Sequence, residues 1–180
     1  LGNVLKTFAI SSGNEKGGLT TIEEKSLGAL CKAGTKPIDG VLKTAEMPKR
    51  PGLYLLDKVG MIDTRQITHY EENDNDGLVT LIASGAHLIL FTTGRGSVVG
   101  SVVSPVIKIC GNPATCKRMG DNFDVKAGGI IEGTHTIAEV GQEIMDVIRE
   151  VASGKPTQAE RLGHKEYYIP YKPARACDVV

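Results

Sequence analysis

Short apolar runs alternate along the chain with stretches whose apolar residues recur at helical spacing. The apolar runs predict strands, and residues 87–91 form the most uniform of them. Such an uninterrupted run is typical of a parallel-sheet strand that is covered on both faces. The predicted strands are residues 4–10, 52–57, 87–91 and 106–110, with 52–57 expected to be buried.

Helix signals fall between these strands. Thr136 and Glu139 form a capping box ahead of an apolar face that continues toward Gly154, which makes this helix the clearest. The strands and helices together predict an α/β fold: a layered, largely parallel sheet flanked by helices, Rossmann-like but without a dinucleotide fingerprint. The predicted helices lie between Thr20 or Thr21 and Gly34, over 78–83 and 114–119, and between Thr136 and Gly154.

The composition narrows the class of protein. Hydrophobic residues make up 41% and charged residues 23% of 180 residues, which is typical of one soluble domain and excludes disordered and fibrous classes. The 21 Lys and Arg side chains balance 21 Asp and Glu side chains, so neither nucleic acid nor a membrane surface is an expected partner. No apolar stretch approaches the roughly 20 residues of a membrane span, and no signal segment opens the chain. We therefore expect a cytoplasmic protein.

One candidate site follows the predicted strand 87–91, at the strand end where open α/β sheets bind ligands. Its glycines let backbone N–H groups converge on an anion, its hydroxyls add donors, and Arg95 offers a planar fork for a carboxylate. The alternative is a glycine-rich turn whose arginine pairs with a neighbouring acid. The Walker and dinucleotide spacings are missing, which disfavours a nucleotide-binding module. The predicted substrate-binding residues here are Thr92, Thr93, Gly94, Arg95, Gly96 and Ser97.

A second candidate anion site lies at the start of the first predicted helix, where a glycine pair precedes Thr20 and Thr21. Glu23 and Lys25 lie in the first turns of this helix and could supply an acid or a base. The alternative is an ordinary capping arrangement with a solvated charged face. Lys108 is a further candidate, because a lysine within an apolar strand needs a partner or an open cleft unless the strand lies at a sheet edge. The four cysteines and four histidines lack metal-ligand spacing, so we expect no metal site within this segment.

Several glycine-rich and charged segments occur in one order along nearly the whole chain: residues 12–14, 17–28, 91–97, 105–109 and 124–129, with a tail at 152–155 and 162–166. In order and approximate spacing they resemble the carboxy-terminal domain of bacterial altronate and galactarate dehydratases. Sulfolactate sulfo-lyase large subunits share this domain. The resemblance implies that residues 1–180 are a single carboxy-terminal domain of a longer dehydratase, whose amino-terminal domains are absent from this chain.

The resemblance also implies a hydro-lyase of sugar-acid catabolism that removes water and yields a 2-keto-3-deoxy acid. Arg95 and the neighbouring backbone would then hold the substrate carboxylate, with Lys108 and Lys25 as further candidates, and Lys25 and Glu23 are the predicted catalytic residues. Family members need a divalent metal, usually Fe²⁺, whose ligands we expect outside this segment. The expected partners are the sugar acid, the enzyme's own amino-terminal domains and further copies of the enzyme. The isolated segment is expected to be inactive.

Two other functions stay open. Residues 61–76 look longer and more acidic than the usual connection in the family, so the substrate is undetermined. A sulfolactate sulfo-lyase, which eliminates sulfite from a similar 2-hydroxy acid, is one alternative. The other is a non-catalytic domain that assembles the subunits of such an enzyme.

Overall fold

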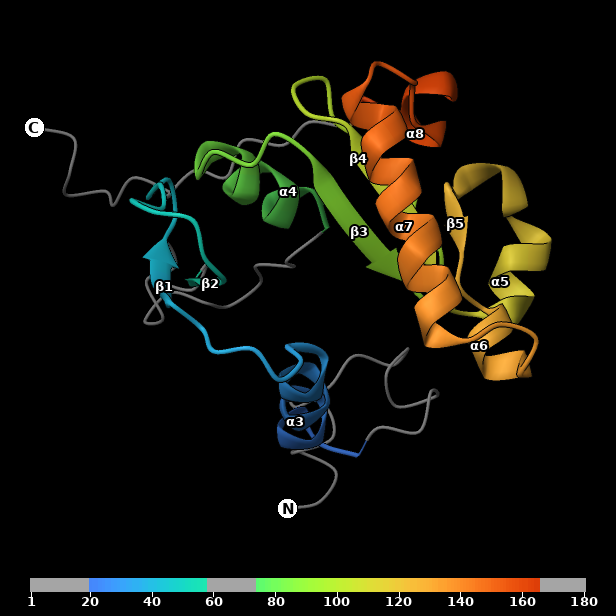
Figure 1. The fold of residues 1–180 in the computed structure, drawn as a ribbon, viewed down its shortest axis with the longest axis horizontal. Helices are drawn as coiled ribbons and strands as arrows, with labels where there is room; N and C mark the ends of the chain where they lie inside the picture. Colours follow the sequence, from blue (N-terminus) through green and yellow to red (C-terminus); the bar gives the residue numbers. More distant parts are fainter. Residues whose placement is uncertain (1–19, 58–73, 166–180) are drawn as a thin grey trace, which may run out of the picture. The chain divides into compact units, whose positions relative to one another are not determined.

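The computed structural model describes residues 20–57 and 74–165 (Figure 1). The chain divides into two compact units, residues 1–40 and 41–180. The predicted strand 4–10 lies outside the described residues, as does most of the acidic segment 61–76. The assignment of residues 1–180 to one domain of a longer enzyme stays a prediction.

The described part of the first unit contains one helix, α3 (Ile22–Lys32). Thr21 is its N-cap, and the Thr21 side chain accepts a hydrogen bond from the Glu24 N–H, which satisfies one of the donors left open at a helix start. Past the C-cap, Gly34 adopts a φ of 76°, a left-handed conformation that suits glycine and ends the helix. The predicted helix and its two end signals are confirmed.

The second unit contains a parallel sheet of β3 (Ile89–Thr93), β4 (Val106–Cys110) and β5 (Val125–Lys126), in the order β3-β4-β5. Both strand pairs are parallel, with the register of the first running from Ile89↔Val106 to Thr93↔Cys110. A separate two-stranded sheet joins β1 (Gly40–Lys43) to β2 (Tyr54–Asp57). A parallel sheet flanked by helices is the predicted α/β fold.

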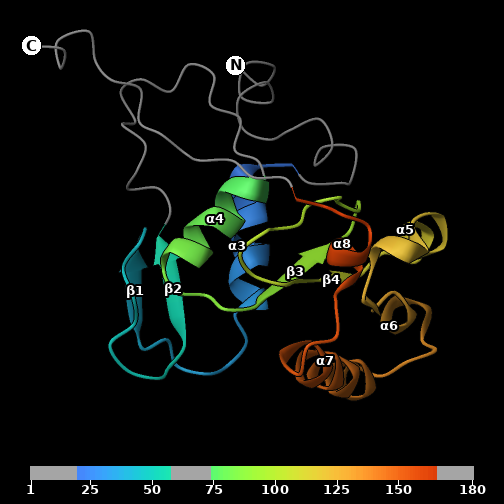
Figure 2. The same ribbon diagram turned by 90° about the horizontal axis from the view of Figure 1, so that it is seen from above.

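Helices cover both faces of the central strand, β4. Ile107 and Ile109 pack in one cluster with Val140 and Val151 of α7 (Ile137–Ala152). Successive strand residues point to opposite faces, and Val106 packs in a second cluster with Leu78 of α4 (Asp74–Ala83). Figure 2 shows α7 and α4 on opposite sides of β3 and β4. The capping box of Thr136 and Glu139 begins α7 as predicted.

Two burial predictions were wrong. Residues 87–91 were expected to be covered on both faces, but among the described strands β3 lies at the edge of its sheet. Its residues alternate in burial, and Leu90 is 44% exposed. The fully buried strand is β4, which includes the lysine. Likewise β2 is not buried, since Leu55 is 55% exposed. An apolar run reports hydrophobicity, whereas burial depends on strand order, which local patterns do not encode.

Short elements complete the second unit. Asn112 caps α5 (Pro113–Arg118), with proline in the first turn as predicted. The sequence pattern missed α6 (Gly129–Glu132) and α8 (Gln158–Arg161), because helices this short show no periodicity. Asp124 fastens α8 to the sheet: its carboxylate accepts from the Lys108 N–H and the Gln158 N–H, each at 2.8 Å.

Candidate anion-binding site

The three parallel strands end at Thr93, Cys110 and Lys126, so the segments that follow them share the carboxyl edge of the sheet. Open α/β sheets bind ligands at this edge. The Gly111 N–H donates to the Thr93 carbonyl oxygen at 3.0 Å and holds the first two of these segments together. A ligand-binding site is therefore expected at this edge of the sheet.

The first segment, residues 94–97, is called the β3 turn below. The Thr93 hydroxyl accepts from the Gly96 N–H at 3.0 Å, and the Thr115 hydroxyl donates to the Gly94 carbonyl oxygen at 2.8 Å. Gly96 has a φ of 88°, and a Cβ there would lie 2.8 Å from Met119 Sδ. The left-handed conformation favours glycine at this position, and a larger residue would also have to displace the Met119 side chain of α5, which supports the turn from one side.

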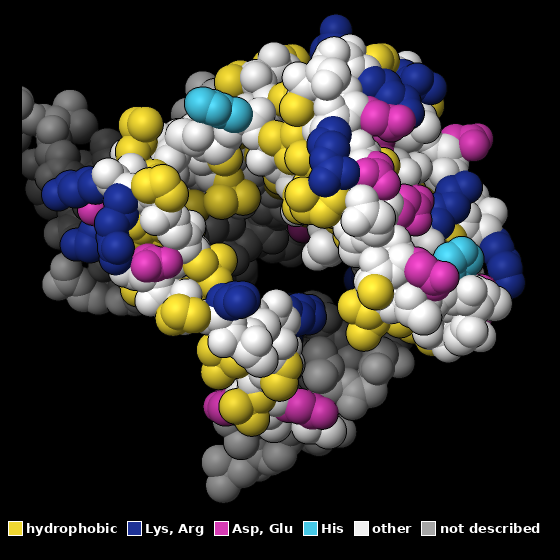
Figure 3. All heavy atoms as spheres, viewed as in Figure 1, with side chains coloured by type: hydrophobic (Ala, Val, Ile, Leu, Met, Phe, Trp, Pro, Cys, Tyr) yellow, Lys and Arg dark blue, Asp and Glu magenta, His cyan; other side chains and the backbone are white. Residues whose placement is uncertain are grey.

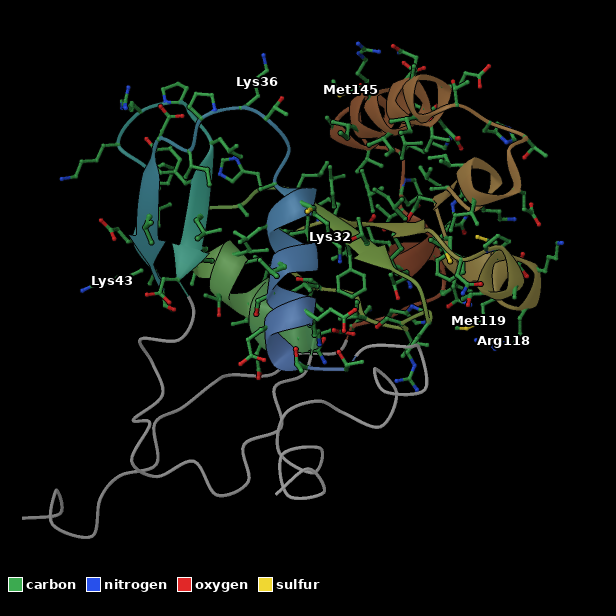
Figure 4. The ribbon with its side chains drawn as sticks, turned by 90° about the horizontal axis from the view of Figure 1, so that it is seen from below. Lys32, Lys36, Lys43, Arg118, Met119 and Met145 are labelled. Atoms are coloured by element: carbon green, nitrogen blue, oxygen red, sulfur yellow. The ribbon has the colours of Figure 1, made fainter. Side chains whose placement is uncertain are left out.

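Arg95 is exposed at the tip of the β3 turn. Its carbonyl oxygen accepts from Arg118 Nη2 at 3.3 Å, which joins the turn to the end of α5. Figure 4 labels Arg118 and Met119 next to each other at this end of the helix. Within residues 20–57 and 74–165, no hydrogen bond or ion pair of the Arg95 guanidinium is recorded, so the expected alternative of an arginine paired with a neighbouring acid is not seen there.

The other polar side chains among the predicted substrate-binding residues 92–97 differ in the hydrogen bonds that they can offer to a ligand. Thr92 is exposed, whereas the Thr93 hydroxyl is used inside the turn. The Ser97 hydroxyl donates to Asp74 Oδ2 at 3.3 Å and accepts from the Val99 N–H at 3.2 Å. Most hydroxyls therefore shape the turn, and the guanidinium is its exposed charge.

Lys108 is fully buried in β4, so the edge position considered for it is wrong. Its Nζ lies 3.4 Å from the Ser97 carbonyl oxygen, to which it donates, and 3.0 Å from His164 Nδ1. A buried ammonium needs such partners because desolvation is costly. Lys108 supports the β3 turn from inside the protein; a direct contact with substrate stays a prediction.

At the start of α3, a carboxylate of the chain itself accepts the hydrogen bonds that an anionic ligand would otherwise accept. The Thr20 N–H and hydroxyl donate to Glu24 Oε2 at 2.8 and 2.6 Å, while Thr21 caps the helix. These bonds, first the one from the Thr20 hydroxyl, hold the pKa of Glu24 below its usual value. Glu23 and Lys25 are exposed, and their catalytic role stays a prediction.

The structure adds a feature that sequence reasoning missed, a cavity of about 580 Å³ lined by α5, β5 and α6, called the α5–α6 cavity below. Figure 3 shows basic, acidic and histidine side chains side by side over α5 and α6. The available signal was a set of cations soon after β4 and at the end of β5. The lining residues with a basic, acidic or imidazole side chain are Lys117, Arg118, Asp121, Lys126, Glu132 and His135.

Comparison with known protein families shows to which family this chain belongs. Residues 2–175 match the family described as D-galactarate/Altronate dehydratase, C-terminal. The chain belongs to this family. The resemblance seen in the ordered motifs is thereby confirmed.

Curated relatives of this dehydratase-family chain fall into two kinds. The (2R)-sulfolactate sulfo-lyase subunit beta of Chromohalobacter salexigens is 37% identical over 161 residues, covering 88% of this chain and 38% of that protein. Altronate dehydratase of Escherichia coli is 37% identical over 159 residues, covering 88% and 29%. Galactarate dehydratase (L-threo-forming) of Escherichia coli is 34% identical over 168 residues, covering 91% and 29%. The chain thus spans between 29% and 38% of the length of these relatives.

The described residues of this dehydratase-family chain do not fit a metal centre. Among them, no group of three or more His, Cys, Asp and Glu side chains is placed to hold a metal ion. That a divalent metal takes part, with ligands elsewhere in the enzyme, stays a prediction. In the same part of the chain, no helix has both the length and the apolar character that crossing a membrane requires.

The dehydratase-family chain also places a thiol at the end of β4. Cys110 is fully buried, and its Sγ donates to the Asn112 carbonyl oxygen at 3.6 Å. Burial, the largest influence, raises the pKa of this thiol, and neighbouring Cys116 raises it further. A protonated, inaccessible thiol is a poor nucleophile, so Cys110 is a core residue rather than a reacting group.

Proposed function

We propose that this chain is the carboxy-terminal part of a carbon–oxygen lyase that dehydrates a sugar acid of the altronate or galactarate type to a 2-keto-3-deoxy acid. The observation that carries the proposal is the exposed Arg95 guanidinium on a turn at the carboxyl edge of the sheet, in a chain of this family. The amino-terminal domains of the enzyme complete the site, and the enzyme is a homo-oligomer.

The chemistry requires a cation beside the substrate carboxylate. A base removes the proton from C2, the electron pair moves toward the carboxylate, and the C3–O bond breaks as the hydroxyl takes up a proton and leaves as water. The resulting enol then tautomerises to the 2-keto acid. Arg95 binds the carboxylate with its planar fork and stabilises the negative charge that develops there. Glu23 or Lys25 supplies the base or the acid.

The test is Arg95→Ala in the complete enzyme, supplied with ferrous iron and assayed on altronate and galactarate. Loss of a paired charge at the reacting carboxylate should lower kcat/KM about 100-fold, since such contacts contribute about 3 kcal/mol. Arg161→Ala is the matched control, because Arg161 is also exposed but lies on α8. Unchanged kcat/KM with an altered oligomer size or stability would instead support a non-catalytic assembly domain.

A second candidate, a sulfolactate sulfo-lyase, is favoured by the 37% identity to a protein of that name. The reaction has the same beginning, removal of the proton beside a carboxylate, but sulfite leaves in place of water. Offering 3-sulfolactate to the same enzyme and measuring released sulfite separates the two. Turnover of none of the three 2-hydroxy acids would contradict both candidates.

A further inference from the structure

The α5–α6 cavity carries more positive than negative charge. Lys117, Arg118 and Lys126 line it together with Asp121 and Glu132, so three cations face two anions and the net charge is about +1 before any contribution from His135. The cavity opens at the carboxyl edge of β4 and β5, where this fold binds ligands. A negatively charged group is therefore the ligand that this lining favours.

The positively charged side chains of the cavity are held only weakly by ion pairs with its acidic side chains. Lys117 Nζ lies 3.2 Å from Glu132 Oε1, but the two side chains are 78% and 41% exposed, and an exposed ion pair of this kind contributes little stability. Lys126 Nζ lies over Gly120, 3.0 Å from where a Cβ would be, and no ion pair of Lys126 is recorded within the described ranges. Both ammonium groups can turn toward an incoming anion.

Glycines let the segments that form the wall of the cavity pack closely together. A Cβ on Gly128 would lie 2.9 Å from the backbone of Pro113, and one on Gly129 would overlap the His135 ring. Any side chain at these positions would displace backbone or the histidine. Pro113 and His135, which both line the cavity, thus lie directly against the two glycines.

Arg118 connects this cavity to the β3 turn. It lines the α5–α6 cavity, and its Nη2 donates to the Arg95 carbonyl oxygen at 3.3 Å. The two cationic positions are thus neighbours at one sheet edge, and a cavity of about 580 Å³ has room for a molecule of sugar-acid size.

We propose that the α5–α6 cavity binds a second anionic group of the substrate, a carboxylate or sulfonate, through Lys126 and Lys117 while Arg95 binds the carboxylate beside the reacting carbons. The substrate class is then a dianion such as an aldarate or a sulfonated hydroxy acid, in preference to a monoanionic aldonate. This inference rests on the proposed function for the reacting end. Galactarate and 3-sulfolactate are dianions, and altronate is a monoanion.

The test compares Lys126→Gln with the wild type in the complete enzyme. We expect KM for a dianionic substrate to rise about tenfold and KM for altronate to change less than twofold, because only the dianion loses a charged contact. Lys126→Arg should restore most of the loss. Lys155→Gln, which removes one positive charge from an exposed ion pair with Glu150, is the control and should leave both values unchanged. Running galactarate and 3-sulfolactate in parallel identifies whether a carboxylate or a sulfonate is preferred.

A binding measurement separates this inference from the proposed function. Titration with galactarate, followed through the His135 ring resonances by NMR, should shift those resonances in the wild type and much less in Lys126→Gln. Dehydration with equal KM changes for dianion and monoanion, or with none, would overturn the second anion position and leave the lyase assignment intact. Binding at His135 without turnover of any 2-hydroxy acid would overturn the lyase assignment and retain the anion position. Tighter binding of inorganic phosphate than of galactarate would contradict the proposed substrate class.

Discussion

The start of α3 and the β3 turn combine glycine, threonine and charge in similar ways, yet they present different groups to solvent. At α3, the hydroxyl and N–H of Thr20 already hold the Glu24 carboxylate, so an anion is in place. At the β3 turn, Thr93 satisfies the backbone internally, and the exposed Arg95 remains as a cation. The comparison teaches that a helix start rich in donors is a ligand site only when its own chain has not supplied the acceptor.

The largest difference should come from replacing the left-handed glycine of the β3 turn and the left-handed glycine that follows the end of α3. Gly96→Ala should lower the free energy of unfolding by about 2 kcal/mol, because left-handed backbone disfavours alanine and its methyl group would lie 2.8 Å from Met119 Sδ. Gly34→Ala should cost only about 1 kcal/mol, since nothing lies within 4 Å of its Cβ position. Denaturant unfolding of the two variants measures both values. Equal losses would show that α5 does not constrain the β3 turn.

A smaller effect is expected from the two threonines that accept backbone hydrogen bonds. Thr21→Ala removes the N-cap of α3 and Thr93→Ala removes the acceptor for the Gly96 N–H, so each should lower the free energy of unfolding by about 1 kcal/mol. Only Thr93→Ala should also raise KM, about threefold, because it loosens the turn that carries Arg95. Steady-state kinetics alongside unfolding separates the two. A matching rise in KM for Thr21→Ala would show that the start of α3 also helps to bind the substrate, beyond supplying an acid or a base.

The smallest effect concerns pH at α3. Because the pKa of Glu24 is lowered in the folded protein, its carboxylate stabilises α3 above the pKa of an unfolded glutamate, and this contribution is lost as pH falls through the lowered value. Helix content followed by circular dichroism between neutral and acidic pH should therefore decline less steeply in Glu24→Gln than in wild type. The β3 turn offers no comparable carboxylate bond from its own residues, so Glu24→Gln should leave KM unaffected. Identical acid profiles for the two proteins would contradict the capping role of Glu24.

Local signals predicted much of the fold. The capping box of Thr136 and Glu139, the Asn112–Pro113 helix start and the glycine at the end of α3 all act over a few residues, and each was confirmed. Burial of whole strands was predicted less well, because it depends on which strand lies between the others. The central position of Lys108 follows from that order and could not be inferred from its neighbours in sequence.

The candidate site was predictable only where one segment forms it. The β3 turn follows directly from its residues, and Arg95 is exposed there as an anion-binding role requires. The α5–α6 cavity, by contrast, draws on segments after β4 and after β5, which the sheet brings together. Lys117 and Lys126 carry no motif that distinguishes them from solvated lysines. That these two lysines line the same cavity can be seen only once the parallel pairing of the strands is known.

The buried side chain of Lys108 links His164 to the β3 turn. Lys108 contacts both the Ser97 carbonyl oxygen and the His164 ring, and a Cβ on Gly100 would clash with the His164 backbone. We therefore expect a substitution at His164 to disturb the loop that presents Arg95, although the two residues belong to remote stretches of the polypeptide. Anyone altering substrate preference by directed evolution should include this histidine among the randomised positions, where inspection of the binding edge alone would overlook it.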